Sequence, residues 1–243
     1  MKTNDNEEIE FMLYFCKYYF SMQQQHAIVL GATGATGRAL VQQLLDHPAF
    51  GAVSIFVRKT PDLKHKKLKV YEIDFSKLKA CKNLIVGDVL FSALGTTRKD
   101  AGSKARQYEV DYTYQYEFAK MASDNGVDQY SLVSSYGANK KSLFFYFKIK
   151  GALEEEIKKL SFQSIHIFQP SSLIRQPDLL RPAEKKLIWV MSKLSRIGFL
   201  ESQRPLAVDI LAKKMIAEAV QNSRGIEVFQ RKNIEDKLTN SRA

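Results

Sequence analysis

Cysteine is scarce in this chain, with only Cys16 and Cys81 among 243 residues. Two thiols cannot build the disulfide framework on which small secreted domains depend. Neither cysteine lies at a metal-binding spacing from a histidine, so no metal site is predicted. A reducing compartment is the simplest expectation, and the sequence therefore predicts a cytoplasmic protein.

Long apolar runs are also missing. An aromatic-rich stretch over residues 9–20 contains Glu10 and Lys17, and it is shorter than the ~20 apolar residues that span a bilayer. Asp5 and Glu7 stand where a secretory signal carries positive charge. We therefore expect no transmembrane segment and no secretory signal. Residues 1–24 are expected to be an N-terminal extension, either a short helix packed on the domain or a peripheral segment.

Acidic residues are in deficit, since 37 Lys and Arg face 26 Asp and Glu, for a formal net charge of +11. Nucleic-acid binding would concentrate this charge on one face. The basic residues are instead spread along the chain in short clusters such as residues 64–69. This favours a solvated basic surface, and no specific nucleic-acid partner is expected.

A glycine-rich turn is the most informative motif that is present. Gly31, Gly34 and Gly37 follow the apolar stretch Ala27–Leu30 and precede the helix-like residues Arg38–Leu45. Glycines let a backbone turn sharply and approach a pyrophosphate, whose charge then meets the positive end of the helix. The strand before the turn and the helix after it favour a dinucleotide site over a flexible glycine turn.

Strand-like and helix-like segments alternate along the rest of the chain. This alternation predicts a doubly wound, mainly parallel α/β sheet with helices on both faces, the Rossmann arrangement. We expect one domain over residues 25–243, with a small substrate-side elaboration around residues 169–206. The expected strands are 27–30, 53–57, 69–73, 88–93, 129–134, 164–168 and 225–229, and the later helices are 113–125, 144–160 and 207–222.

Charged residues after the second strand address the identity of the dinucleotide. Arg58 and Lys59 stand where an acid would bind a free ribose, so NADP(H) is favoured over NAD(H), with an ordinary basic loop as the alternative. Asp74 ends the third strand, either near the adenine or as a turn cap. The small-residue turn at Leu94 and Gly95 can pass close to the cofactor's ribose.

The catalytic signal is Tyr146 and Lys150, four residues apart on one face of an expected helix. A phenol has an ordinary pKa of about 10, and a nearby ammonium favours its phenolate. Tyr146 can then exchange a proton while a hydride moves to or from the cofactor. Ser134 or Ser135, at the end of the fifth strand, can present a hydroxyl to the same oxygen, or the serines simply cap the strand.

These motifs together resemble the short-chain dehydrogenase/reductase superfamily in its atypical NAD(P)-binding branch. The resemblance to Tat-interacting-protein-like oxidoreductases is closer, through residues 94–98, 132–138 and 146–151. It implies that Tyr146 is the proton acceptor and that Lys150 contacts the nicotinamide ribose. It implies NADP(H) contacts from Thr33, Gly34, Ala35, Thr36, Arg58, Lys59, Leu94 and Gly95, with Leu173 and Arg181 as further cofactor-side positions.

The sequence thus predicts an NADP(H)-dependent oxidoreductase that acts on a small carbonyl or alcohol substrate. Tyr146 is the expected acid/base, Lys150 its electrostatic partner, and Ser134 or Ser135 the hydroxyl that orients the substrate. A non-catalytic NADP(H)-binding redox sensor or regulatory protein is the alternative.

Overall fold

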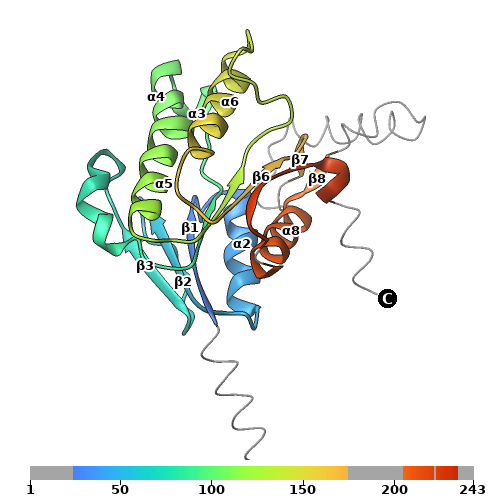
Figure 1. Ribbon diagram of the computed structural model, residues 1–243. Helices are drawn as coiled ribbons and strands as arrows, with labels where there is room; N and C mark the ends of the chain where they lie inside the picture. The colour runs from blue at the N-terminus through green and yellow to red at the C-terminus, as the bar shows by residue number, and fades with distance from the viewer. Residues whose placement is uncertain (1–23, 175–204, 222, 235–243) are drawn as a thin grey trace, which may run out of the picture.

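The computed structural model describes residues 24–174, 205–221 and 223–234. A seven-stranded sheet runs through its centre in the order β3-β2-β1-β4-β5-β6-β9, and every neighbouring pair is parallel (Figure 1). Its strands are β1 (Gln25–Leu30), β2 (Phe50–Val57), β3 (Leu68–Glu72), β4 (Val89–Ser92), β5 (Gln129–Val133), β6 (Ser164–Gln169) and β9 (Gly225–Gln230). Two short strands, β7 (Leu173–Ile174) and β8 (Leu206–Ala207), form a separate parallel pair.

Helices cover both faces of this sheet. The α-helices are α2 (Ala35–Asp46), α3 (Arg98–Ala101), α4 (Lys104–Tyr108), α5 (Tyr114–Asp124), α6 (Phe145–Ile157) and α8 (Val208–Gln221). A kinked 3₁₀ segment, η1 (Phe75–Leu84), precedes β4, and one π-helical turn, η2 (Glu109–Thr113), joins α4 to α5.

The two hydrophobic cores follow from the alternation of side chains along each strand. In β1, Ala27 and Val29 pack with α2 and α8 on one face. Ile28 and Leu30 pack on the other face with apolar side chains of η1, α5 and α6. Since successive strand residues point to opposite faces, a strand buried on both faces is a continuous apolar run, as the sequence of β1 is.

The predicted fold class is confirmed by this architecture. All seven expected strands form, with ends that differ by no more than three residues. The first helix begins at Ala35, inside the glycine motif, and the helix expected over 144–160 spans Phe145–Ile157. Residues 1–23 of the expected N-terminal extension, whether a short helix or a peripheral segment, lie outside the described residues.

Close backbone contact shapes the turn between β1 and α2. Gly31 has a φ of +85°, a left-handed conformation that favours glycine. A Cβ on Gly37 would lie 2.0 Å from the Gly31 carbonyl oxygen, and a Cβ on Gly31 would lie 2.5 Å from the Leu94 nitrogen. The turn, the start of α2 and the loop after β4 therefore meet backbone to backbone.

This contact predicts that Gly37→Ala destabilises the fold, because the added methyl has no room without a backbone shift. Overpacking of this kind costs about 1–3 kcal/mol, which urea unfolding would measure. Gly34→Ala is the matched control, since its Cβ would lie 3.4 Å from the Gly31 carbonyl oxygen and its φ is −78°. That control is expected to change stability by less than about 1 kcal/mol, because the gain from restricting the unfolded chain is offset by the lower preference for alanine at an N-cap; equal losses in both variants would contradict the packing argument.

Candidate active site

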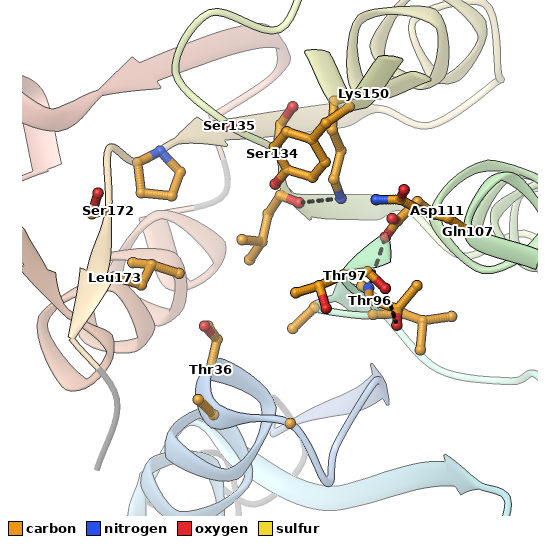
Figure 2. A pocket seen from close by; sticks show the side chains of 18 of the residues that line it. Thr36, Thr96, Thr97, Gln107, Asp111, Ser134, Ser135, Lys150, Ser172 and Leu173 are labelled. Atoms are coloured by element: carbon orange, nitrogen blue, oxygen red, sulfur yellow. Dashed lines mark hydrogen bonds between the residues drawn. The ribbon is translucent and has the colours of Figure 1, made fainter. Parts of the chain in front are cut away.

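The candidate site lies at the carboxyl edge of the sheet, where the loops after β1, β4, β5 and β6 line a cavity of about 750 Å³. Figure 2 shows its walls: Ser134, Ser135 and Lys150 on one side, Thr36 opposite, and the pairs Thr96 with Asp111 and Ser172 with Leu173 on the remaining sides. A second cavity of similar volume lies beside it, and both are lined by Leu94, Gly95 and Thr96. The carboxyl edge thus offers an elongated, two-part binding region.

The predicted site residues fall into three groups by position. The first cavity is lined by Gly34, Ala35, Thr36, Leu94, Gly95, Ser134, Ser135, Tyr146, Lys150 and Leu173. The second is lined by Arg58 and Asp74, together with Leu94 and Gly95. Neither set of lining residues includes Gly31, Thr33, Gly37 or Lys59. Arg181 lies outside the described residues.

The start of α2 supplies the first cavity with a helix end suited to an anion. Gly34 is the N-cap and provides no side-chain cap, and the first turn of α2 contains no acidic residue. Gly34, Ala35 and Thr36 line the cavity at this point. The positive end of the helix dipole therefore adjoins the cavity without a neutralising side chain from its own first turn.

Tyr146 and Lys150 reach the cavity from one face of α6. The Tyr146 side chain is 38% exposed and its ring packs edge-on against Phe147. Lys150 is only 4% exposed, and its Nζ donates a hydrogen bond to the Val133 carbonyl at 3.4 Å. A buried ammonium thus lies one helical turn from the phenol, in the same cavity.

The two serines after β5 differ in their hydrogen bonds. Ser134 is buried, and its hydroxyl donates to Glu154, which also accepts two bonds from the Gln169 amide at 3.0 Å. Ser135 is half-buried, and its hydroxyl donates a long 3.3 Å bond to the Tyr136 carbonyl. The Ser134 hydroxyl is therefore committed to the Glu154 carboxylate, whereas among the described residues the Ser135 hydroxyl has no comparably strong partner.

Asp111 is a cavity residue that the sequence analysis missed. The single π turn η2 places it there, with no exposed surface, and its Oδ1 accepts the Thr96 N–H at 3.0 Å (Figure 2). Burial raises the pKa of the Asp111 carboxyl, while the Lys150 charge and the Thr96 N–H act in the opposite direction. The carboxyl thus anchors the loop after β4 and lies within the electrostatic reach of Lys150.

The second cavity contains charges of both signs. Arg58 and Arg106 line it, and so do Glu72 and Asp74. Both carboxylates have local partners: Glu72 accepts the Thr60 N–H and hydroxyl at 2.9 and 2.6 Å, and Asp74 accepts the Ser76 N–H and hydroxyl at 2.9 and 2.7 Å. Glu72 thereby fixes the loop that carries Arg58, a role that the sequence analysis also missed.

Fold and site together define the class: a Rossmann-type dinucleotide-binding domain, with strand order reversing at β1 and β4 beside the cavity. Residues 31–178 match an NAD(P)H-binding family model, and the chain belongs to this family.

Curated relatives agree with this assignment. Protein FMP52, mitochondrial, of Candida albicans is 38% identical over 151 residues, which cover 60% of this chain and 66% of that protein. Protein HTATIP2 of Rattus norvegicus is 32% identical over 169 residues, covering 68% of this chain and 69% of that protein. The match to HTATIP2 confirms the resemblance to Tat-interacting-protein-like oxidoreductases. Both matches span about two thirds of the relative's length.

Solved structures with the same fold come from dehydrogenases and related enzymes. The Bordetella bronchiseptica enzyme WbmH in complex with NAD+ matches with a TM-score of 0.64 at 14% identity, covering 86% of this chain and 76% of that one. A short-chain dehydrogenase/reductase superfamily protein from Agrobacterium tumefaciens with bound NAD gives a TM-score of 0.62 at 13% identity, covering 84% and 77%. These matches confirm the Rossmann-type fold.

The expected cytoplasmic location is wrong. The FMP52 relatives of Candida albicans and Aspergillus fumigatus are both named mitochondrial proteins. A low cysteine count excludes a disulfide framework but does not separate one reducing compartment from another, which is why the composition misled. Within the described residues, no helix has the length and apolar character needed to cross a membrane.

Asp111 leads to a pH-dependent prediction. Burial raises the pKa of the Asp111 carboxyl above its value in the unfolded chain. The free energy of unfolding therefore falls as the pH rises from the unfolded pKa to the folded one, because the unfolded chain ionises first. Asp111→Asn keeps an oxygen for the Thr96 N–H and removes this cost. Urea unfolding between pH 4 and 8 is expected to show the variant gaining on the parent as pH rises. Asp62→Asn, at an exposed carboxylate, is the control, and a gain that shrinks with rising pH would contradict the argument.

Proposed function

We propose that this protein is an NADP(H)-dependent oxidoreductase that transfers a hydride to or from a small carbonyl or alcohol substrate. The observation that carries the proposal is a single cavity that combines two kinds of group. Tyr146, Lys150 and Ser135 line it beside Gly34, Ala35 and Thr36 at the uncapped start of α2. Groups suited to proton transfer and a helix end suited to an anion thus line the same cavity.

The residues present fit a dinucleotide. The turn packs closely against neighbouring backbone at Gly31 and Gly37, and Gly34, which lines the cavity, leaves the backbone there open to a pyrophosphate. The pyrophosphate would be held by Gly34, Ala35 and Thr36. The middle of the dinucleotide would lie along Leu94 and Gly95, which line both cavities. Lys150 would contact the nicotinamide ribose. When bound, the nicotinamide supplies or accepts the hydride.

Tyr146 is the proposed acid/base. In the direction of carbonyl reduction, its phenol donates a proton to the substrate oxygen, and in the reverse direction its phenolate takes that proton back. Lys150, buried one helical turn away on the same helix, places its ammonium in the same cavity as the phenol. Ser135 donates a hydrogen bond to the same substrate oxygen, because the Ser134 hydroxyl already donates to Glu154.

Arg58 supports NADP(H) over NAD(H). It follows β2 and lines the second cavity, where the adenosine half would lie, and a guanidinium can bind a 2′-phosphate through two hydrogen bonds. The Glu72 carboxylate in the same cavity is already engaged by Thr60. The mitochondrial names of the fungal relatives favour a mitochondrial location for this chain as well.

Turnover with matched variants tests the chemistry. Tyr146→Phe keeps the ring and removes the proton donor, so NADPH oxidation across a panel of aldehydes, ketones and quinones is expected to fall at least about a hundredfold. Calorimetric NADPH affinity should change little. Ser135→Ala is expected to lower turnover more than Ser134→Ala, which removes a hydroxyl that already serves Glu154.

Two outcomes would contradict this scheme. Equal turnover of a genuine substrate by Tyr146→Phe and the parent would remove Tyr146 from the chemistry. Binding of NADPH with no turnover of any carbonyl would instead favour a redox sensor, for which Tyr146→Phe would leave the only activity intact.

Cofactor choice has its own matched pair of variants. Arg58→Ala is expected to weaken NADPH binding about 10- to 100-fold, the loss typical of a charge-assisted hydrogen bond, and to leave NADH binding nearly unchanged. Lys59→Ala, at a neighbouring cation outside both lining sets, is the control and should have a much smaller effect. Equal affinities of the parent for NADPH and NADH in calorimetric titrations would overturn the preference.

A further inference from the structure

An unusually exposed pair of apolar side chains precedes α6. Leu143 is 100% exposed and Phe144 is 71% exposed, and no other large apolar side chain of the described residues is more than 57% exposed. The two residues, which we term the apolar tip, lie where the loop after β5 meets the start of α6. Single exposed apolar residues are ordinary, but two adjacent ones this exposed need an explanation.

The loop that carries the apolar tip is held in place by specific contacts. Asn139 donates its N–H to the Phe147 carbonyl at 3.0 Å, and its side chain accepts the Lys141 N–H at 2.8 Å. Gly151 lets this loop approach α6 directly, since a Cβ there would lie 2.4 Å from the Lys140 nitrogen. The Phe144 N–H is bonded to the Ser142 hydroxyl at 3.2 Å. An ordered loop therefore presents both apolar side chains to the solvent.

Lysines surround the apolar tip. Lys140 and Lys141 precede it and Lys148 follows it by one helical turn, all three exposed. Lys104 adds a fourth cation, with its Nζ 5.6 Å from the centre of the Phe145 ring. Lys140 also pairs with the Glu155 carboxylate at 2.9 Å. Exposed apolar side chains flanked by lysines are complementary to a membrane surface, where anionic headgroups lie above the acyl chains.

We propose that the apolar tip docks this protein on membrane surfaces that contain anionic lipid. Leu143 and Phe144 enter the boundary between headgroups and acyl chains, and the surrounding lysines contact the lipid phosphates. A protein partner fits less well, because a stable interface buries about 800 Å² on each side and its core is depleted in lysine. Since Phe145 and Tyr146 line the first cavity, the docked protein holds that cavity beside the lipid.

Vesicle co-sedimentation of the full chain tests the apolar part of this proposal. The probes are phosphatidylcholine vesicles with and without phosphatidylglycerol, and binding is expected only with the anionic lipid. The double variant Leu143→Ser, Phe144→Ser is expected to bind about tenfold more weakly or worse, because it removes the side chains that leave water. Leu84→Ser, Val86→Ser is the matched control: these residues are 43% and 57% exposed and lie before β4, at the opposite edge of the sheet.

The charged part has a parallel design. Lys141→Gln, Lys148→Gln is expected to weaken binding about fivefold per lysine, the effect of one cation close to an anionic surface. Lys64→Gln, Lys66→Gln changes the net charge equally at exposed positions of the loop before β3 and should cost less. Equal losses from both pairs would show that only net charge matters and would overturn docking through the apolar tip.

Fluorescence identifies what covers the apolar tip. Phe144→Trp is introduced into a chain whose single tryptophan, Trp189, is replaced by Phe, and its emission should shift to the blue on adding anionic vesicles. A blue shift that rises with protein concentration without vesicles would indicate a second copy and overturn the proposal. So would sedimentation of the Leu143→Ser, Phe144→Ser variant equal to that of the parent. None of these readouts depends on turnover, so they stand or fall separately from the proposed reaction.

Discussion

The contact between the glycine turn and its two neighbours is the constraint on which the rest of the site depends. Gly31 touches the backbone of the loop after β4, and Gly37 touches Gly31, at distances that exclude any side chain. These contacts bring the start of α2 to the same sheet edge as Leu94 and Gly95. Parallel strands then bring the end of β5, with its serines, to that edge as well. Backbone packing therefore forms the cavity, whichever side chains occupy the candidate site.

Helix α6 positions three polar side chains of the candidate site relative to one another. Tyr146, Lys150 and Glu154 are spaced by four residues and so lie on one helical face. Lys150 bonds to the last carbonyl of β5 and Glu154 bonds to Ser134, so two contacts fix this face against the strand end. Burying such groups without partners would cost several kcal/mol each. The hydrogen-bond partners that fix the position of α6 thus also offset the cost of burying the polar groups on this face of the helix.

The sequence was sufficient for the sheet because its signals are local. Apolar runs such as Ala27–Leu30, and the glycine spacing after them, depend only on residues close in the chain. These patterns predict the parallel sheet, and the sheet in turn brings Gly34, Tyr146 and Lys150 to one cavity. Asp111 and Glu72 were missed because their roles come from partners far along the chain, Thr96 and Thr60. The strands β7 and β8 pair residues that are more than thirty positions apart. No local sequence pattern predicts this pairing.

Composition alone also concealed how the positive charge is arranged. Counted along the chain, the lysines are dispersed, and dispersed charge gives only weak binding that salt screens. In the fold, Lys141 and Lys148 lie next to two apolar side chains, and the two kinds of contact respond differently to ionic strength. Screening weakens the lysine contribution, whereas the removal of Leu143 and Phe144 from water does not depend on counterions. A surface that combines both retains part of its affinity at salt concentrations that abolish binding through charge alone.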